Sequence, residues 1–450
     1  MSSAAVQSAL FEPPKVTAGF RDPAFSKNRD LPLHRWVPWV AGFSAHFVED
    51  CLDHYLPRGS RGQRWVLDPF AGVGTTLVQA YLRGLNVIGF EINPYAALAA
   101  RLKLETRSVS TIAFARAISA FERFMERHST NGSVPHSVPP SGFSGRTLLF
   151  SPKVERKILF VLDFVEHIED TRIRDLFRLA LGSVMISVSN YSYEPSLTRR
   201  AAVDKPDIED APVSNVLADK LRLMLDDTRW MQNALRELAK TPTADVIPAS
   251  IFVAKEHLAR PGFVSLVVTS PPYLNNYHYP RNTRPQLHWL GFASGKGYNG
   301  GYENDSFGKF WQTVRSSDPI DLTFNHAGLE RTLHALRQLN ADQGPYGGPG
   351  WANYVATYFN DTEKFCHILG RLLKPGAFAV IVLGNSVIQG LEVKTDQLFG
   401  EIAERCGLKF CETLMLRKKR TGSSIIQSSV RVDKAATKVV LYESAIVLQK

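Results

Sequence analysis

A glycine-rich stretch near the start of the chain has the residue types that bind the anionic end of a ligand. It reads Asp68-Pro-Phe-Ala-Gly-Val-Gly-Thr-Thr76 and follows the short apolar run 64–67. Gly72 and Gly74 lack Cβ, so the backbone can turn tightly and approach a ligand closely. The helix expected to begin after them offers unpaired N–H groups to a carboxylate or a phosphate. Neither Lys-Ser nor Lys-Thr follows the glycines, which disfavours a phosphate-binding P-loop.

Glu91 extends this pattern toward a nucleoside. It ends the apolar run 86–90, which we expect to be the next buried strand after a helix over 75–83 and a stop at Gly84. Strand, glycine turn, helix and strand in this order form a βαβ unit. An acidic residue at the end of the second strand can accept hydrogen bonds from both hydroxyls of a ribose. Tight strand–helix packing would also explain the glycines alone, whereas their combination with Glu91 favours a nucleoside cofactor.

A second stretch, Thr269-Ser-Pro-Pro-Tyr273, follows the apolar run 264–268 directly. Its two prolines fix an extended turn and remove backbone donors, so neighbouring carbonyls stay free to accept hydrogen bonds from an amino group. Tyr273 adds a flat ring on which a nucleobase can stack. Taken alone, the stretch is explained equally well as a simple turn at the end of a strand.

The remaining pattern indicates which elements must position these two stretches. Aromatic and apolar residues at helical spacing predict a helix over 33–56. Segment 281–351 is polar, glycine-rich and without a clear pattern, which is typical of a functional or disordered loop. Between the two stretches we expect a mostly helical insertion, with helices at 113–126, 153–167, 173–189 and 213–238.

The C-terminal part returns to an alternation of helices and strands. A helix is expected from Ala352 to Leu373, where Lys374-Pro-Gly is a stop signal. A buried strand, a helix and a closing hairpin of two strands should follow at 377–383, 395–406, 408–416 and 438–448. The predicted fold class is therefore α/β, with a mostly parallel sheet that ends in an antiparallel hairpin.

Composition limits the class of protein. The 450 residues, 44% of them hydrophobic, suffice for one large α/β domain with insertions or for two domains. Lys and Arg number 53 against 43 for Asp and Glu, a net charge of +10 that favours a polyanionic partner. The four cysteines form no CxxC pair, so we expect neither a disulfide framework nor a metal site. No apolar run approaches the roughly 18 residues of a membrane helix and no signal peptide is evident, which predicts a reducing, cytoplasmic setting without a membrane.

Taken together, these stretches resemble the N4-cytosine and N6-adenine DNA methyltransferases, which depend on S-adenosylmethionine (AdoMet). In that family the Asp68–Thr76 stretch is the AdoMet-binding motif I, Glu91 is motif II and Ser-Pro-Pro-Tyr is the catalytic motif IV. The segment from His34 to Phe47 resembles motif X, which closes over the methionine end of AdoMet. The resemblance covers 33–106, 246–280 and 352–450, and it implies the Rossmann-like, seven-stranded methyltransferase fold.

By position in these motifs, the resemblance assigns a set of site residues. Ser250 stands where the family usually carries an acid that contacts the cofactor adenine, which is a departure from the pattern. The implied catalytic residues are Ser270, Pro271, Pro272 and Tyr273. The implied cofactor-binding residues are Asp68, Pro69, Phe70, Ala71, Gly72, Gly74, Thr75, Glu91, Ile92, Asn93 and Ser250.

Ser270 bears on the choice of base. In the family, Ser at the first motif IV position is more typical of N4-cytosine enzymes, and Asp or Asn of N6-adenine enzymes. We therefore favour N4 of cytosine in duplex DNA, with the base flipped out of the stack, and a cognate restriction endonuclease as a possible partner. The alternatives are an N6-adenine enzyme, an RNA amino-group methyltransferase, and a catalytically idle AdoMet- or DNA-binding protein.

Aromatic and basic residues after the second stretch, and near the final hairpin, are candidates for DNA contacts. They are Tyr277, Arg281, Arg284, Arg417 and Lys418, although core aromatics and a solvated basic face would explain them equally well. The expected organisation is a loose arm (1–30), three core parts and two insertions. The core parts are 31–106, 246–280 and 351–450, the helical insertion is 107–245, and an insertion for target recognition is 281–350.

Overall fold

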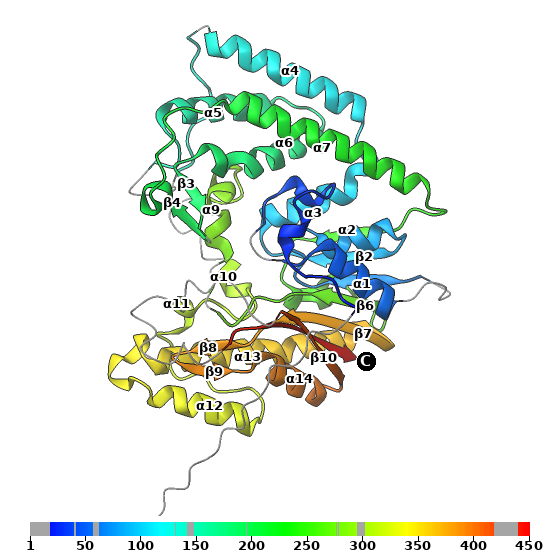
Figure 1. The fold of residues 1–450 in the computed structure, drawn as a ribbon, viewed down its shortest axis with the longest axis vertical. Coiled ribbons are helices and arrows are strands. Elements are labelled where there is room, and N and C mark those ends of the chain that lie inside the picture. Colours follow the sequence, from blue (N-terminus) through cyan, green and yellow to red (C-terminus); the bar gives the residue numbers. More distant parts are fainter. Residues whose placement is uncertain are drawn as a thin grey trace, which may run out of the picture.

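The computed structural model describes residues 19–39, 42–56, 63–130, 132–141, 148–194, 196–275, 277, 279–294, 302–417 and 440–450. Its centre is a seven-stranded sheet in the order β10-β11-β7-β6-β1-β2-β5 (Figure 1). The first five strands along the chain run parallel, and β11 runs antiparallel to both of its neighbours. The predicted fold class is therefore confirmed. The strands are β1 Trp65–Asp68, β2 Asn86–Phe90, β5 Ala244–Ile247, β6 Val264–Thr269, β7 Leu373–Leu383, β10 Lys409–Arg417 and β11 Glu443–Gln449.

Helices cover both faces of this sheet, which explains why its central strands are apolar throughout. In β6 every residue is buried, and successive side chains enter different cores. Leu266 and Val268 join the core under the N-terminal helices, whereas Val264 and Val267 join the core under the C-terminal helices. The first core is covered by α1 Ala45–Tyr55, α2 Thr75–Leu82 and α3 Pro94–Glu105, and the second by α13 Gly348–Leu372 and α14 Thr395–Arg405.

The insertion between β2 and β5 is mostly helical and forms a separate layer beside α3 (Figure 1). Ser151 and Asp170 cap its second and third helices, since their side chains accept the N–H groups of the first turns. Its aromatic side chains, such as Phe121 and Phe177, continue the first core without a break. The helices are α4 Thr111–Thr130, α5 Pro152–Glu166, α6 Thr171–Val184 and α7 Val213–Arg236. Between α6 and α7 the chain forms a small antiparallel pair of strands, β3 Tyr191–Tyr193 and β4 Leu197–Arg199.

The second insertion differs from its prediction. Where it is described, it folds into short helices instead of a loop, because its scattered apolar residues find partners on α13. Leu329, Leu333 and Leu336 line one face of α12 and are buried, and the Trp311 ring stacks on Trp351 at 4.8 Å. The helices are α9 Tyr279–Trp289, α10 Tyr302–Asp305, α11 Trp311–Val314 and α12 Ala327–Gln338.

The N-terminal prediction was wrong in two places. The expected helix over 33–56 is only a single 3-10 turn at His34–Trp36 followed by α1, because Pro38 interrupts the segment and Ser44 caps a new start. The expected loose arm is, in its described part from residue 19, packed on α1. Ala24 pairs with Phe43 in an isolated bridge.

The remaining elements are short. They comprise α8 Ala254–His257, the pair β8 Ser386–Ile388 and β9 Leu391–Val393, and 3-10 helices at Phe25–Asn28, Thr106–Ser108, Met185–Val188, Arg200–Val203, Ile251–Val253 and Ala341–Tyr346. Within the described ranges, we find no helix that combines the length and the apolar character needed to cross a bilayer.

Candidate active site

The turn after β1 uses its two glycines in different ways. Both have positive φ, +50° at Gly72 and +84° at Gly74. A Cβ on Gly74 would lie 3.0 Å from the Cβ of Ala100, so this glycine permits close packing of α3. A Cβ on Gly72 would instead meet the Trp39 indole at 3.3 Å. Gly74 therefore fits the packing explanation of the motif, while Gly72 faces a cavity.

Glu91 joins the turns after β1 and β2. One carboxylate oxygen accepts the N–H of Gly72 and the other accepts the N–H of Asn93, both at 2.7 Å. Burial raises the pKa of Glu91 to about 7, against the two backbone donors, which favour the ionised form. Each oxygen of the carboxylate keeps acceptor capacity beyond its one backbone bond. The side chain can therefore receive two hydroxyl donors without breaking the contacts that hold it.

Asp68 joins the turns after β1 and β6. The Thr269 hydroxyl donates to its carboxylate at 2.7 Å, and the N–H of Phe70 donates at 3.1 Å. The Thr76 hydroxyl adds a bond to the carbonyl of Val268 at 3.1 Å. Burial raises the pKa of Asp68 to about 6, opposed mainly by the Thr269 bond. These contacts hold the glycine turn and the Ser-Pro-Pro-Tyr turn side by side at neighbouring strand ends.

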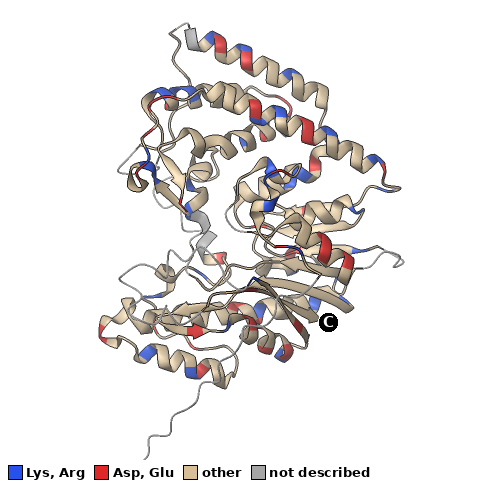
Figure 2. Cartoon of the chain, viewed as in Figure 1, with Lys and Arg blue, Asp and Glu red and all other residues tan. Residues whose placement is uncertain are grey.

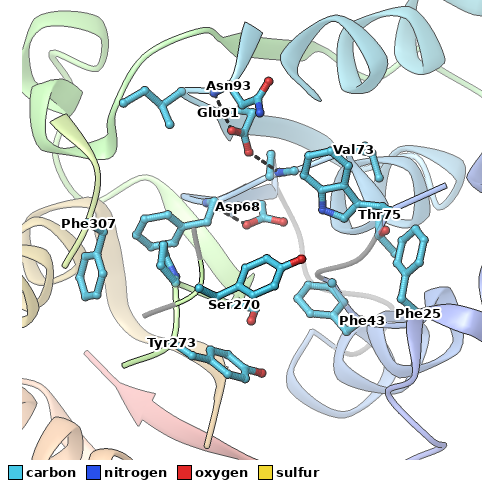
Figure 3. Close-up of a pocket in the computed structure, with 18 of the residues that line it drawn as sticks. Phe25, Phe43, Asp68, Val73, Thr75, Glu91, Asn93, Ser270, Tyr273 and Phe307 are labelled. Carbon is cyan, nitrogen blue, oxygen red and sulfur yellow. Dashed lines mark hydrogen bonds between the residues drawn. The ribbon is translucent and has the colours of Figure 1, made fainter. Parts of the chain in front are cut away.

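The Ser-Pro-Pro-Tyr turn begins where β6 ends (Figure 3). Ser270, Pro272 and Tyr273 line the same cavity as the β1 turn, whereas the Pro271 side chain is buried away from it. The Tyr273 hydroxyl donates to Glu443 at the start of β11, at 2.8 Å. The ring is thereby fixed at both ends, by the turn and by a strand 170 positions further along the chain.

The shared cavity has a volume of about 1050 Å³. Sites for one small molecule usually measure about 300–1,000 Å³, so this cavity has room for a nucleoside cofactor and part of a second ligand. Among the residues assigned from sequence, Gly74 and Pro271 are absent from its wall. Those that line it are Asp68, Pro69, Phe70, Ala71, Gly72, Thr75, Glu91, Ile92, Asn93, Ser250, Ser270, Pro272 and Tyr273.

Ser250, the departure from the family pattern, has a structural contact in this chain. Its hydroxyl donates to the carbonyl of Asp305 at 2.8 Å and also caps the short helix at Ile251–Val253. This bond draws the segment 305–310 of the second insertion onto the cavity wall. There the Phe307 ring lies 5.4 Å from Phe70 in an edge-on arrangement. The result is an aromatic wall beside the loop after β5.

Two further parts of the wall, and Phe25, were missed by sequence reasoning. One part lies on the helical insertion and the other is the segment with Phe307. No local signal marks these residues, because each reaches the cavity only through tertiary packing. They include Phe25, Ser183, Ser187, Tyr193, Lys220, Phe307 and Lys309. His34, Trp39 and Phe43 also line the cavity, and they belong to the segment that resembles motif X.

The residues predicted to contact DNA occupy different settings. Tyr277 lines the cavity, and its hydroxyl accepts a bond from the Asn282 amide. Arg281 and Arg284 are exposed on α9. Arg417 pairs with Asp22 at 2.8 Å and lies 3.7 Å from Glu443. Lys418 lies outside the described residues.

The strand order, the reversed last strand and the paired turns at the ends of β1 and β6 define a protein of the Rossmann-like methyltransferase fold. Residues 21–101 match the family of DNA methylases designated N6_N4_Mtase. This match covers the part of the fold that holds the turns after β1 and β2.

Curated relatives extend the similarity to most of the chain. Type II methyltransferase M.BsoBI of Geobacillus stearothermophilus is 23% identical, over 89% of this chain and 83% of the relative. Type II methyltransferase M.AvaI of Nostoc sp. is 22% identical over 89% of this chain and 84% of the relative. Type II methyltransferase M.MvaI of Kocuria varians is 22% identical over 75% and 74%.

Proposed function

We propose that this protein transfers a methyl group from AdoMet to N4 of cytosine in duplex DNA. The observation that carries the proposal is the shared cavity at the ends of β1 and β6, where Asp68 and Thr269 tie the two turns together at 2.7 Å. A methyl donor held by the first turn and a base held by the second would meet within this one cavity.

The residues present fit AdoMet. Glu91 keeps acceptor capacity for both ribose hydroxyls, as its backbone contacts use one bond on each oxygen. The loop after β5 lies beyond Glu91 in the strand order, and there Phe307 and Ile251 offer an apolar wall for the adenine. The methionine end would then extend the other way, toward Gly72 and Thr75. Bound AdoMet supplies an electrophilic methyl group.

The Ser-Pro-Pro-Tyr turn would position the amino group. The Ser270 hydroxyl and the Pro271 carbonyl can each accept an N–H of the amine, which draws its lone pair out of conjugation with the ring. Tyr273 would hold the plane of the base by stacking, its own position fixed by Glu443. Catalysis here rests on placement and on preorganised acceptors. The base must leave the helix to enter the cavity, so base flipping is required.

The choice of cytosine rests on Ser270, through the family association of Ser at this position with N4-cytosine enzymes. Pairing with a restriction endonuclease is supported by the relatives, which are named type II methyltransferases. Duplex DNA as partner agrees with the net charge of +10. Lys and Arg are spread over the helical insertion, on α4 to α7 and near the β3–β4 hairpin, among acidic residues (Figure 2).

The test is methyl transfer in vitro followed by identification of the product. Purified protein is incubated with AdoMet carrying a deuterated methyl group and with mixed-sequence duplex DNA, and the nucleosides are separated by mass spectrometry. We expect deuterated N4-methyldeoxycytidine, and far less of it with a Ser270→Ala variant after the same short incubation. Deuterated N6-methyldeoxyadenosine would overturn the choice of base. Methylation of tRNA without methylation of DNA would overturn the choice of nucleic acid.

A further inference from the structure

Lys220 brings a positive charge from the helical insertion to the cavity. It lies on α7, lines the cavity and is partly buried. Its ammonium donates to the carbonyl of Arg35 at 3.0 Å. Burial lowers the pKa of Lys220, and the charge of Arg35 lowers it further, while Asp227 opposes both. An ammonium in this setting is best satisfied by an anion that enters the cavity.

Asp227 does not provide that anion, because its carboxylate is already saturated. It accepts the N–H of Leu33 at 2.8 Å, the indole N–H of Trp36 at 3.0 Å and the guanidinium of Arg35 at 2.6 Å. Asp227 therefore neutralises Arg35 and anchors the N-terminal segment. Within the described residues, Lys220 has no carboxylate in ion-pair contact.

His34 adds an independent observation at the same end of the cavity. Its side chain is only 3% exposed and lines the wall. The amide nitrogen of Gln79 lies 2.9 Å from its Nε2. A glutamine amide nitrogen only donates, so Nε2 accepts. Burial lowers the pKa of His34 to about 3, so the ring is neutral and carries its proton on Nδ1.

That Nδ1–H has no hydrogen-bond partner in the described part of the chain. A buried donor without a partner is costly, and it marks a place where a ligand acceptor is missing.

The ammonium and the imidazole N–H belong to one neighbourhood. Lys220 donates to the carbonyl of Arg35, the residue next to His34. Burial and the charge of Lys220 lower the pKa of Lys103, whose ammonium donates to the carbonyl of Val73 at 2.7 Å. Val73 directly precedes the N-terminus of α2, which is the positive end of that helix. The carboxylates of Asp68 and Glu91 also line the cavity. They would keep an anionic group away from themselves.

We propose that Lys220, with the Nδ1–H of His34, binds the α-carboxylate of the methionine part of AdoMet. This inference rests on the proposed function, since AdoMet is the ligand that brings this anion. It assigns the helical insertion a role in cofactor binding, in addition to any role in DNA recognition. The charge of the insertion then helps to set the direction of the cofactor, with its ribose at Glu91 and its carboxylate at α7.

The test compares two ligands that differ only in this carboxylate, AdoMet and decarboxylated AdoMet, by calorimetry on the full chain. We expect the wild-type protein to prefer AdoMet roughly 10- to 100-fold, as charge-assisted hydrogen bonds usually give. Lys220→Met should lose that preference while its affinity for decarboxylated AdoMet stays within about twofold. Lys220→Arg should retain part of the preference. His34→Phe should reduce it less than Lys220→Met, because only a neutral donor is lost.

The matched control is Arg229→Ala, which removes an exposed cation from the same helix. Among the described residues, Arg229 pairs with Asp226 alone, at 3.1 Å. The variant should leave both affinities unchanged. An equal loss of both ligands in Lys220→Met would make the residue structural and overturn the inference, as would an unchanged preference. The wild-type comparison decides the case if Lys220→Met does not fold, since a wild-type chain without preference also overturns it. A chain that binds neither ligand would instead refute the proposed function.

Discussion

The two turns that meet in the cavity are held in opposite ways. In the turn after β1, backbone N–H groups hold both oxygens of Glu91, and Thr269 holds Asp68. In the turn after β6, the Ser270 hydroxyl has no hydrogen bond to any described residue. The carboxylates on the cofactor side are therefore already held by internal hydrogen bonds, whereas the Ser270 hydroxyl on the base side is left to accept a bond from the substrate. The difference indicates that binding of the cofactor and reaction of the base should respond separately to mutation.

Ser270→Ala is the strongest test of whether the two turns respond separately to mutation. Removing one preorganised hydrogen-bonding group at a reacting centre commonly costs about 10²–10³ in kcat. We expect a loss of that size, measured as single-turnover methylation of duplex DNA. The affinity for AdoMet, measured by calorimetry, should stay unchanged because the Ser270 hydroxyl forms no hydrogen bond with the described residues of the cofactor turn. A large loss of AdoMet affinity would show that the two turns are not separable.

Glu91→Gln tests the opposite side. The amide keeps the size of the side chain but loses the charge that accepts the hydroxyl donors. We expect AdoMet affinity to fall roughly 10- to 100-fold by calorimetry, since hydrogen bonds to charged groups contribute about 1.5–3 kcal/mol. The rate of methylation at saturating AdoMet should change much less. A change confined to that rate would contradict the assignment of Glu91 to the cofactor.

The pH dependence of AdoMet binding sharpens the same assignment. Because burial raises the pKa of Glu91 to about 7, part of the population is protonated below neutral pH and cannot accept both hydroxyls. Affinity should fall by about tenfold between pH 8 and pH 6, and Glu91→Gln should flatten most of that change. The measurement should stay at or above about pH 6, because Asp68, whose pKa is about 6, also becomes protonated below it.

The free energy of unfolding of the ligand-free protein should depend on pH in the opposite direction to AdoMet affinity. The folded-state pKa of Glu91 lies above its ordinary value of 4.5, so its protonated form is favoured by folding. This contribution to the free energy of unfolding is present below pH 4.5 and is lost as the pH rises through about 7. Urea unfolding of wild type and Glu91→Gln across this range would measure it.

A smaller effect is expected from Tyr273→Phe. This change removes the bond to Glu443 but keeps the ring for stacking. One hydrogen bond contributes about 1 kcal/mol, so kcat/KM for DNA should fall only a few-fold. Tyr273→Ala also removes the stacking surface, worth about 1–3 kcal/mol per base, and should cost more. Equal effects of the two variants would argue against stacking.

The smallest effects concern the predicted phosphate contacts. Arg281 is exposed on α9, whereas Arg417 is paired with Asp22. Arg281→Ala should weaken DNA binding uniformly across sequences and reduce the slope of log affinity against log salt by about 1. Arg417→Ala should leave that slope nearly unchanged, because its charge is already matched. The reverse result would place the DNA backbone over the C-terminal hairpin.

The sequence determined the two turns and the fold class, because both depend on short-range pattern. The Asp68–Thr76 and Thr269–Tyr273 stretches each follow an apolar strand, and parallel strands place their ends at one edge of the sheet. The family resemblance then supplied the roles proposed for Glu91 and Ser270. The helical insertion was also predictable, since its helices have regular apolar spacing.

Only the tertiary structure decided which distant residues complete the cavity. Phe307 and Lys220 come from two segments that no spacing connects, and packing alone brings them to the same cavity. The second insertion folds into helices because α13 offers partners for its scattered apolar residues, which a local pattern cannot reveal. A pattern in the sequence predicts local structure, because it reflects interactions between residues that are close along the chain. The ion pairs and buried donors that orient a ligand depend on distances across the fold.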